Sequence, residues 1–170
     1  MRFLIHAAVA LTVLTACNPT FNWRDVRPDG TRLELLLPCK PDKAQRTVSM
    51  ASQQTKMNLL SCDAGGVTFA VSMADINDAG KTDAVLAQWQ SATLTNIKAG
   101  SPVSRHAFKV PGLAAVGVMV KATGQRANGQ AVSSQAAYFA DGSQVFQAVM
   151  YADKVALEAS ETFFSSLKFD

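Results

Sequence analysis

Residues 132–151, VSSQAAYFADGSQVFQAVMY, decide the fold because they predict two strands joined by a tight turn. The segments Val132–Ala140 and Gln144–Tyr151 read as strands of similar length. Asp141-Gly142 lies between them, and Asp-Gly is a strong signal for a two-residue hairpin. The sequence therefore predicts two antiparallel strands that are neighbours in a sheet.

Short extended segments separated by turn residues continue on both sides of this hairpin. Gly, Pro and Asp bound these segments, and such residues interrupt strands. We expect antiparallel neighbours, a hairpin loop at 124–129, and further breaks at Pro38, near Gln54-Thr55 and at 63–66. The other expected strands are Arg32–Leu37, Arg46–Gln53, Met57–Cys62, Val67–Met73, Ser104–Val110 and Leu113–Ala122.

Two segments change to helical spacing. Lys81–Lys98 places Val85, Leu86, Trp89, Thr93 and Ile97 at helical intervals, and the run ends at Gly100-Ser101-Pro102. Lys154–Leu167 repeats this pattern with Val155, Ala159, Phe163 and Leu167. The fold class that follows is α+β, an antiparallel β-sheet with two main helices packed on it.

Two short motifs resemble those of PsbP-like domains. Leu37-Pro38-Cys39-Lys40-Pro41 is similar to the family's FPxKP motif, although Cys39 stands where the family often has glycine. The ending 163–169, FFSSLKF, is similar to the family's FFxSFxF. This resemblance covers about Arg32–Asp170 and implies an α/β/α sandwich with a non-enzymatic accessory role. It implies no catalytic residue, because the matching positions are structural.

The first residues have the order of an export signal. Arg2 precedes an apolar run, Phe3–Leu14, which is short of the roughly 20 residues that a membrane-spanning helix needs. Leu14-Thr15-Ala16-Cys17 looks like the lipobox of bacterial lipoproteins, which implies cleavage before Cys17 and lipid on its sulfur. The alternative is an ordinary secretory signal that leaves Cys17 as one more thiol.

This signal gives a domain plan and a location. We expect a signal peptide at 1–16, a lipidated N-terminus with a short tether at 17–30, and one α+β domain at 31–170. In Gram-negative lipoproteins, an aspartate directly after the modified cysteine is typical of retention in the inner membrane. Here that residue is Asn18. The resemblance therefore implies a protein anchored at the periplasmic face of the outer membrane.

Cysteine pairing follows from this location. The chain has three cysteines, and lipidation of Cys17 leaves Cys39 and Cys62 as a pair in an oxidising compartment. A disulfide between them would contribute about 3 kcal/mol in the chain-entropy model. A structural zinc site is the weaker alternative, because two cysteines without nearby histidines supply only half of the usual four ligands.

The tether carries four side chains that favour a membrane interface. Phe21 and Trp23 lie close to Arg24 and Arg27, and aromatic and basic side chains are favoured at the headgroup level. These residues are candidate contacts with the membrane or with a partner. The alternative, which we favour, is that the aromatic rings pack on the domain as its first ordered segment.

Charge and catalytic motifs exclude several classes of function. Lys and Arg total 16 against 13 Asp and Glu, and scattered charges of this kind do not indicate a nucleic-acid binder. His106 is the only histidine after residue 16, and a general base needs an orienting partner that the sequence does not identify. The sequence has no Gly-x-Ser-x-Gly elbow. We therefore expect no enzyme activity, no catalytic residue and no cofactor.

Three motifs suggest metal or phosphate sites but are better explained by structural roles. Asp75–Gly80 is similar to the start of a calcium loop, but Ala79 and Leu86 occupy two ligand positions, so turn and capping roles are favoured. Gly124–Gly129 lacks the Lys-Ser/Thr of a phosphate loop. Methionines on expected strands favour the core over copper binding: Met50, Met57, Met73, Met119 and Met150.

Three functions remain open. The first is a lipid-anchored module that binds or scaffolds another envelope component. The second is a carrier that holds a small apolar ligand between the Lys81–Lys98 helix and the sheet. The third and weakest is a hydrolase. An enclosed apolar cavity would favour the carrier, clustered perturbed ionisable groups would favour the enzyme, and a flat surface with an exposed apolar patch would favour partner binding.

Overall fold

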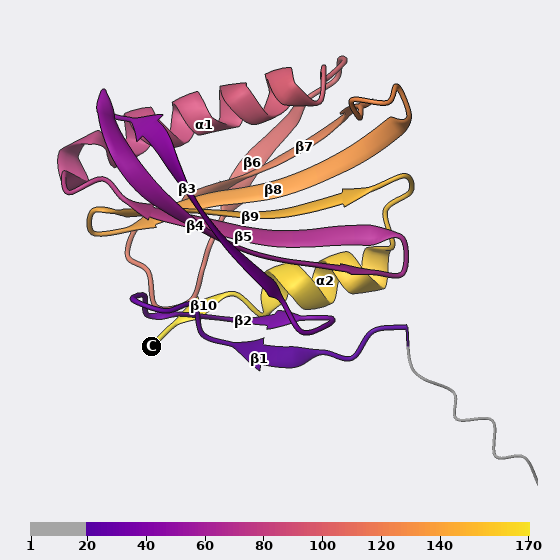
Figure 1. Ribbon diagram of the computed structural model, residues 1–170, viewed down its shortest axis with the longest axis horizontal. Helices are drawn as coiled ribbons and strands as arrows, with labels where there is room; N and C mark the ends of the chain where they lie inside the picture. Colours follow the sequence, from indigo (N-terminus) through magenta and orange to yellow (C-terminus); the bar gives the residue numbers. More distant parts are fainter. Residues whose placement is uncertain (1–19) are drawn as a thin grey trace, which may run out of the picture.

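A computed structural model describes residues 20–170, and this part of the chain forms an α+β fold (Figure 1). The described residues contain antiparallel sheets and two α-helices, which confirms the expected class. The expected signal peptide at 1–16 and the expected lipidation of Cys17 lie outside the described residues.

A seven-stranded antiparallel sheet forms the centre of the fold. Its strands follow the order β3-β4-β5-β9-β8-β7-β6, so β3 and β6 are the edges. The bounds are β3 Asp42–Met50, β4 Gln53–Ala64, β5 Val67–Asp75, β6 Ser104–Phe108, β7 Gly117–Gln125, β8 Ala131–Asp141 and β9 Gln144–Ala152.

The β8–β9 hairpin is confirmed at the centre of this sheet. Asp141 pairs with Gln144, which leaves Gly142 and Ser143 as the turn. Gly142 has a φ of 58°, a left-handed backbone that glycine adopts without steric cost. The second expected hairpin loop, at 124–129, joins β7 to β8 as well.

Helix α1 (Thr82–Asn96) covers one face of the sheet (Figure 1). Val85 and Leu86 are buried against strand residues that include Val145 and Val149. A short 3-10 turn, η1 (Ala79–Lys81), precedes the helix. The observed helix lies within the expected Lys81–Lys98 segment.

The opposite face packs against helix α2 (Leu157–Ser165) and a small antiparallel sheet (Figure 1). The small sheet has the order β1-β2-β10, with β1 Arg24–Val26, β2 Leu33–Leu37 and β10 Lys168–Phe169. Phe69 of β5 meets Phe163 of α2 edge to face, with 5.4 Å between ring centroids. Both faces of the central strands are therefore buried, which explains the nearly continuous apolar runs of β5 and β9.

The turn between β3 and β4 differs from the expectation. It lies at Ala51-Ser52, where both residues have positive φ, and not near Gln54-Thr55. Strand β3 accordingly starts at Asp42 rather than Arg46. The expectation was wrong because residues 52–55 are a polar run without the apolar alternation that would locate the turn.

The first residues of β7 and α2 also differ from the sequence-based expectation. Strand β7 begins at Gly117 and not at Leu113, because Val110–Leu113 forms a turn and Pro111 accepts a hydrogen bond from Phe169 at the end of the chain. Helix α2 begins at Leu157 and not at Lys154, because Ala156 before it is extended.

The short strands β1 and β10 were not expected. Strand β1 lies within the segment 17–30 that the sequence assigns to the tether, and it pairs with β2. Regular secondary structure is therefore present within the segment 17–30, from Arg24 to Val26. Among the methionines, Met73, Met119 and Met150 are buried in the core.

Candidate functional site: a polar groove at the end of the sheet

The expected disulfide between Cys39 and Cys62 is present in the structure. The two Cα atoms lie 6.0 Å apart, within the range that a disulfide spans. Cys39 follows β2, and Cys62 lies on β4. The bond therefore fastens the small sheet to the central sheet.

The two aromatic residues of the tether pack on the domain. The rings of Phe21 and Trp23 stack at 5.8 Å, and both meet the edge of Phe69, at 6.3 and 5.9 Å. Their side chains are half-buried. This arrangement is the packing alternative that the sequence left open, and it assigns these rings to the core.

The two arginines of the tether remain at the surface. Arg24 is exposed, and Arg27 pairs with Glu34 of β2. Hydrogen bonding with Asp170, followed by that with Lys168, lowers the pKa of Glu34. Arg27 therefore belongs to an ion-pair network that joins β2 to the end of the chain.

The remaining sequence candidates are dispersed over the molecule. His106 is exposed on the edge strand β6. The calcium-loop-like segment Asp75–Gly80 caps its own backbone. Asp75 accepts a hydrogen bond from the Asn77 N–H, and Asp78 accepts one from the Gly80 N–H. The hydrogen bond from Lys81, with that from Gly80, lowers the pKa of Asp78.

Residues 20–170 contain neither a metal-binding cluster nor a helix that could span a membrane. This part of the chain has no group of three or more His, Cys, Asp or Glu that could hold a metal ion. Its helices are too short or too polar for any to cross a bilayer.

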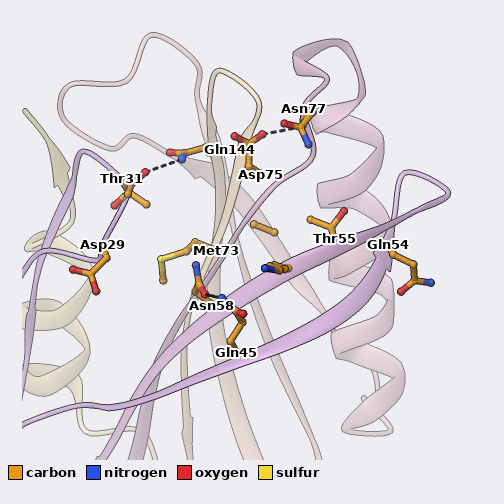
Figure 2. A pocket seen from close by; sticks show the side chains of 13 residues that line it. Asp29, Thr31, Gln45, Gln54, Thr55, Asn58, Met73, Asp75, Asn77 and Gln144 are labelled. Atoms are coloured by element: carbon orange, nitrogen blue, oxygen red, sulfur yellow. Dashed lines mark hydrogen bonds between the residues drawn. The ribbon is translucent and has the colours of Figure 1, made fainter.

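The candidate site is a groove between the loop 28–31 and the strands β3, β4 and β5. Two adjoining cavities of about 390 and 440 Å³ form it, and they share Asp29, Gln45, Asn58 and Met73. Figure 2 shows side chains of the loop on one side and side chains of the β3–β4 ribbon on the other. We call this feature the distal groove.

Strand register brings the polar side chains of the distal groove together. Gln45 of β3 lies opposite Asn58 of β4, and Asn58 lies opposite Met73 of β5. Gln45 Nε2 donates to Asn58 Oδ1 at 2.8 Å. The groove therefore has an amide pair beside a single thioether at its floor.

The loop side of the groove is held by two polar contacts. Gln144 Nε2 donates to the carbonyl of Gly30 at 2.9 Å, and Lys43 Nζ donates to Asp29 Oδ2 at 3.0 Å. The first contact ties the loop to the β8–β9 hairpin, and the second ties it to β3. Both contacts therefore link the loop to strands that border the groove.

The distal groove and the start of the described chain lie at opposite ends of the molecule. In Figure 1 the chain enters at the right, whereas the loop 28–31 and the β8–β9 hairpin lie at the left. Phe21 lies next to Gly65, in the turn just before β5, while Met73 and Asp75 near the other end of β5 line the groove. Nine residues of β5 span roughly 25 Å.

Sequence reasoning did not find this groove. Gln45 lay outside the expected strand that began at Arg46, and the misplaced turn near Gln54-Thr55 gave no basis for pairing Gln45 with Asn58. A correct position for the turn at Ala51-Ser52 would have predicted this pair, because the turn sets the register of a hairpin.

Comparisons with known proteins give weak similarities of structure. No protein-family model and no curated protein matches this chain. A structure from Bacteroides thetaiotaomicron aligns with 81% of the chain at 12% identity and a TM-score of 0.49, and the chain spans 45% of that protein. A protein of unknown function from Pseudomonas aeruginosa aligns with 82% of the chain at 18% identity and a TM-score of 0.44, and the chain spans 88% of it.

Proposed function

We propose that this protein is a lipid-anchored envelope protein at the periplasmic face of the outer membrane, where it binds or scaffolds another envelope component. The distal groove is the proposed binding site. The observation that carries this proposal is the position of the groove at the end of the molecule opposite to Thr20.

The geometry of the anchor supports this orientation. Two residues, Asn18 and Pro19, lie between Cys17 and Thr20, and the three Cα–Cα steps reach at most about 10 Å. With lipid on Cys17, the end of the domain near Phe21 lies next to the bilayer. The distal groove then faces away from the membrane, roughly 25 Å further out along β5.

The PsbP-like resemblance is part of the same proposal. Helix α1 on one face, and α2 with the small sheet on the other, are compatible with the sandwich that the resemblance implies. An accessory binding role fits a domain that has a groove lined by several polar side chains at one end of its sheet.

Side chains fill the middle of the layer between α1 and the sheet. The cavities that remain beside α1, of about 330 and 120 Å³, lie at its surface, where exposed residues such as Asp83 and Gln88 line them. Gln147 Nε2 donates to Thr93 Oγ1 and to the Tyr138 hydroxyl, each at 2.9 Å, between the sheet and α1. Trp89 packs edge to face on Tyr138 at 6.4 Å. This packing supports the binding module in preference to a carrier.

Two experiments in intact cells test the proposal. The first replaces Cys17 with Ser, and we expect loss of labelling by a fatty-acid probe and release from the outer-membrane fraction. An unlabelled native protein, or a Cys17→Ser variant that stays lipidated, would contradict the anchor.

The second experiment places a photo-crosslinking amino acid at Gln54 in the groove or at Asn128 in the β7–β8 loop. Both side chains are exposed amides, which makes Asn128 a matched control. We expect crosslinked products at position 54 and not at position 128. Equal products at both positions, or none at position 54, would contradict the groove as the binding site.

A further inference from the structure

We propose that the distal groove binds an uncharged, polyhydroxylated sugar chain. This inference rests on the proposed function in one respect, namely that the groove is the binding site. It goes further because it names the chemical class of the bound component.

The charge of the groove favours a neutral ligand. Its charged lining residues are two acids, Asp29 and Asp75, and two bases, Lys43 and Lys56. Lys43 already pairs with Asp29. Because the charges balance, the groove does not concentrate a polyanion or a polycation by long-range attraction.

The polar groups of the groove match hydroxyl groups. An amide side chain both donates and accepts hydrogen bonds, and so does a sugar hydroxyl. The Gln45–Asn58 pair uses one donor of Gln45 and one acceptor of Asn58. Among the described residues, Gln45 Oε1 and Asn58 Nδ2 have no other hydrogen-bond partner, so both can bind a ligand.

The lining of the groove has no aromatic anchor for a peptide. Sites for apolar ligands are usually lined by aromatic and aliphatic side chains, and peptide recognition on a surface relies on such anchors. No aromatic residue lines either cavity of the groove. The apolar lining residues are Pro28, Ala44, Leu59, Leu60, Met73 and Ala74. An extended peptide is therefore the less favoured ligand.

The shape of the groove suits a chain of several units. The two cavities adjoin and most of their polar lining residues are exposed, so the ligand can continue past either end. Each cavity lies within the usual range for small-molecule sites, about 300–1,000 Å³.

The test uses the mature, lipidated protein in detergent micelles and saturation-transfer NMR. Three probes are compared: the tetramer of N-acetylglucosamine, the tetramer of glucose, and tetra-alanine. We expect at least one sugar tetramer to bind, while tetra-alanine does not.

A matched pair of double variants locates the binding. Gln45→Ala/Asn58→Ala removes the groove amide pair, and we expect the Kd for the sugar to rise at least roughly tenfold, as loss of two hydrogen bonds predicts. Asn128→Ala/Gln130→Ala removes a second amide pair, also 2.8 Å long, in the β7–β8 loop, and we expect no change. Both pairs are exposed, so neither double variant disturbs the core.

The outcomes separate the ligand class from the proposed function. Binding of tetra-alanine alone, equal sugar binding by both double variants, or no sugar binding would each overturn the sugar chain as ligand. Crosslinking at Gln54 in cells together with any of these results would leave the proposed function standing. Sugar binding that is lost with Gln45 and Asn58 supports the inference.

Discussion

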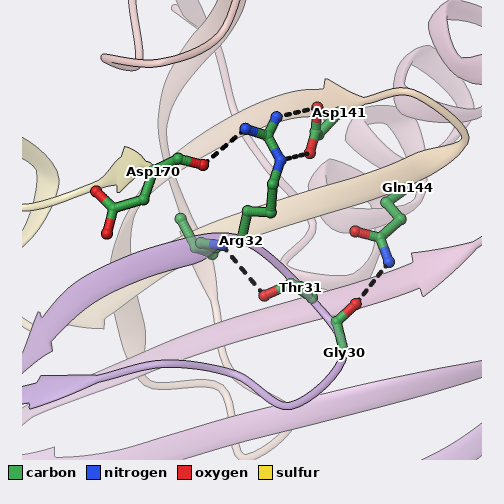
Figure 3. Close-up of polar contacts among 7 residues, drawn as sticks. Gly30, Thr31, Arg32, Asp141, Gln144 and Asp170 are labelled. Carbon is green, nitrogen blue, oxygen red and sulfur yellow. Dashed lines mark hydrogen bonds and ion pairs between the residues drawn. The ribbon is translucent and has the colours of Figure 1, made fainter.

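The guanidinium of Arg32 and the carboxylate of Asp141 form two parallel hydrogen bonds across 109 residues of sequence, at 3.1 and 2.8 Å (Figure 3). Arg32 Nη1 also donates to the backbone carbonyl of Asp170 at 2.7 Å. The start of β2, the β8–β9 hairpin and the end of the chain therefore meet at one side chain. The contact of Gln144 with Gly30 lies beside this junction and forms the rim of the distal groove.

Replacing Arg32 with Ala should loosen the groove rim while leaving the core intact. Arg32 is exposed, so we expect only a small fall in the melting temperature. Backbone amides at 28–31 and 141–144 should exchange hydrogen several-fold faster. Arg126→Ala is the control, because it removes another Arg–Asp pair at the opposite end. Equal exchange in both variants would contradict a role for Arg32 at the rim.

Removing the disulfide should lower the stability of the whole domain. A loop closed across 23 residues contributes about 3 kcal/mol to the free energy of unfolding in the chain-entropy model. We expect Cys39→Ala/Cys62→Ala to lose about that amount in urea denaturation. Unchanged stability would mean that the bond adds no constraint beyond that of the paired strands.

The aromatic core between the sheet and α2 should be the most sensitive part of the fold. Phe163 is fully buried against Phe69, and Phe163→Ala should cost about 3–5 kcal/mol of unfolding free energy. Leu157 on the same helix is 74% exposed, and Leu157→Ala should change it by less than about 0.5 kcal/mol. Similar losses of unfolding free energy in both variants would contradict the packing of α2 that buries Phe163 and exposes Leu157.

Alkaline pH should destabilise the fold through Tyr151. Burial, with a smaller effect of Tyr138, raises the pKa of Tyr151 to about 12, whereas an unfolded tyrosine titrates near pH 10. The stabilising contribution is therefore complete below about pH 10 and is lost as pH rises toward 12. Between about pH 10 and 12 the unfolding free energy of the native chain should fall by roughly 2 kcal/mol more than that of the Tyr151→Phe variant. Identical pH profiles in chemical denaturation would contradict this assignment.

Local chemistry explains what the sequence predicted well. Asp141-Gly142 predicted the central hairpin because tight hairpin turns require a positive φ, which glycine adopts readily. Gly142 has such a φ in the structure. The helix at 82–96 was predicted from the spacing of Val85, Leu86 and Trp89, which depends only on neighbours along the chain.

Non-local pairing explains what the sequence missed. Strand β10 has two residues and exists because it pairs with Leu33 and Glu34 of β2, far away in the sequence. The distal groove depends on the register of Gln45 against Asn58 and on the loop 28–31, which no single segment encodes. Local sequence patterns therefore did not predict the candidate site, although they predicted most of the strands.

The two walls of the distal groove differ in how freely they can change over evolution. One wall consists of strand residues such as Asn58 and Met73, whose backbones pair with neighbouring strands. The other wall is the loop 28–31, which is held by hydrogen bonds from Gln144 and Lys43 to single atoms. Substitutions in this loop alter what the groove contacts while the sheet stays intact. The proposed ligand preference of the groove can therefore be altered at these few loop positions without disturbing the strand pairing of the other wall.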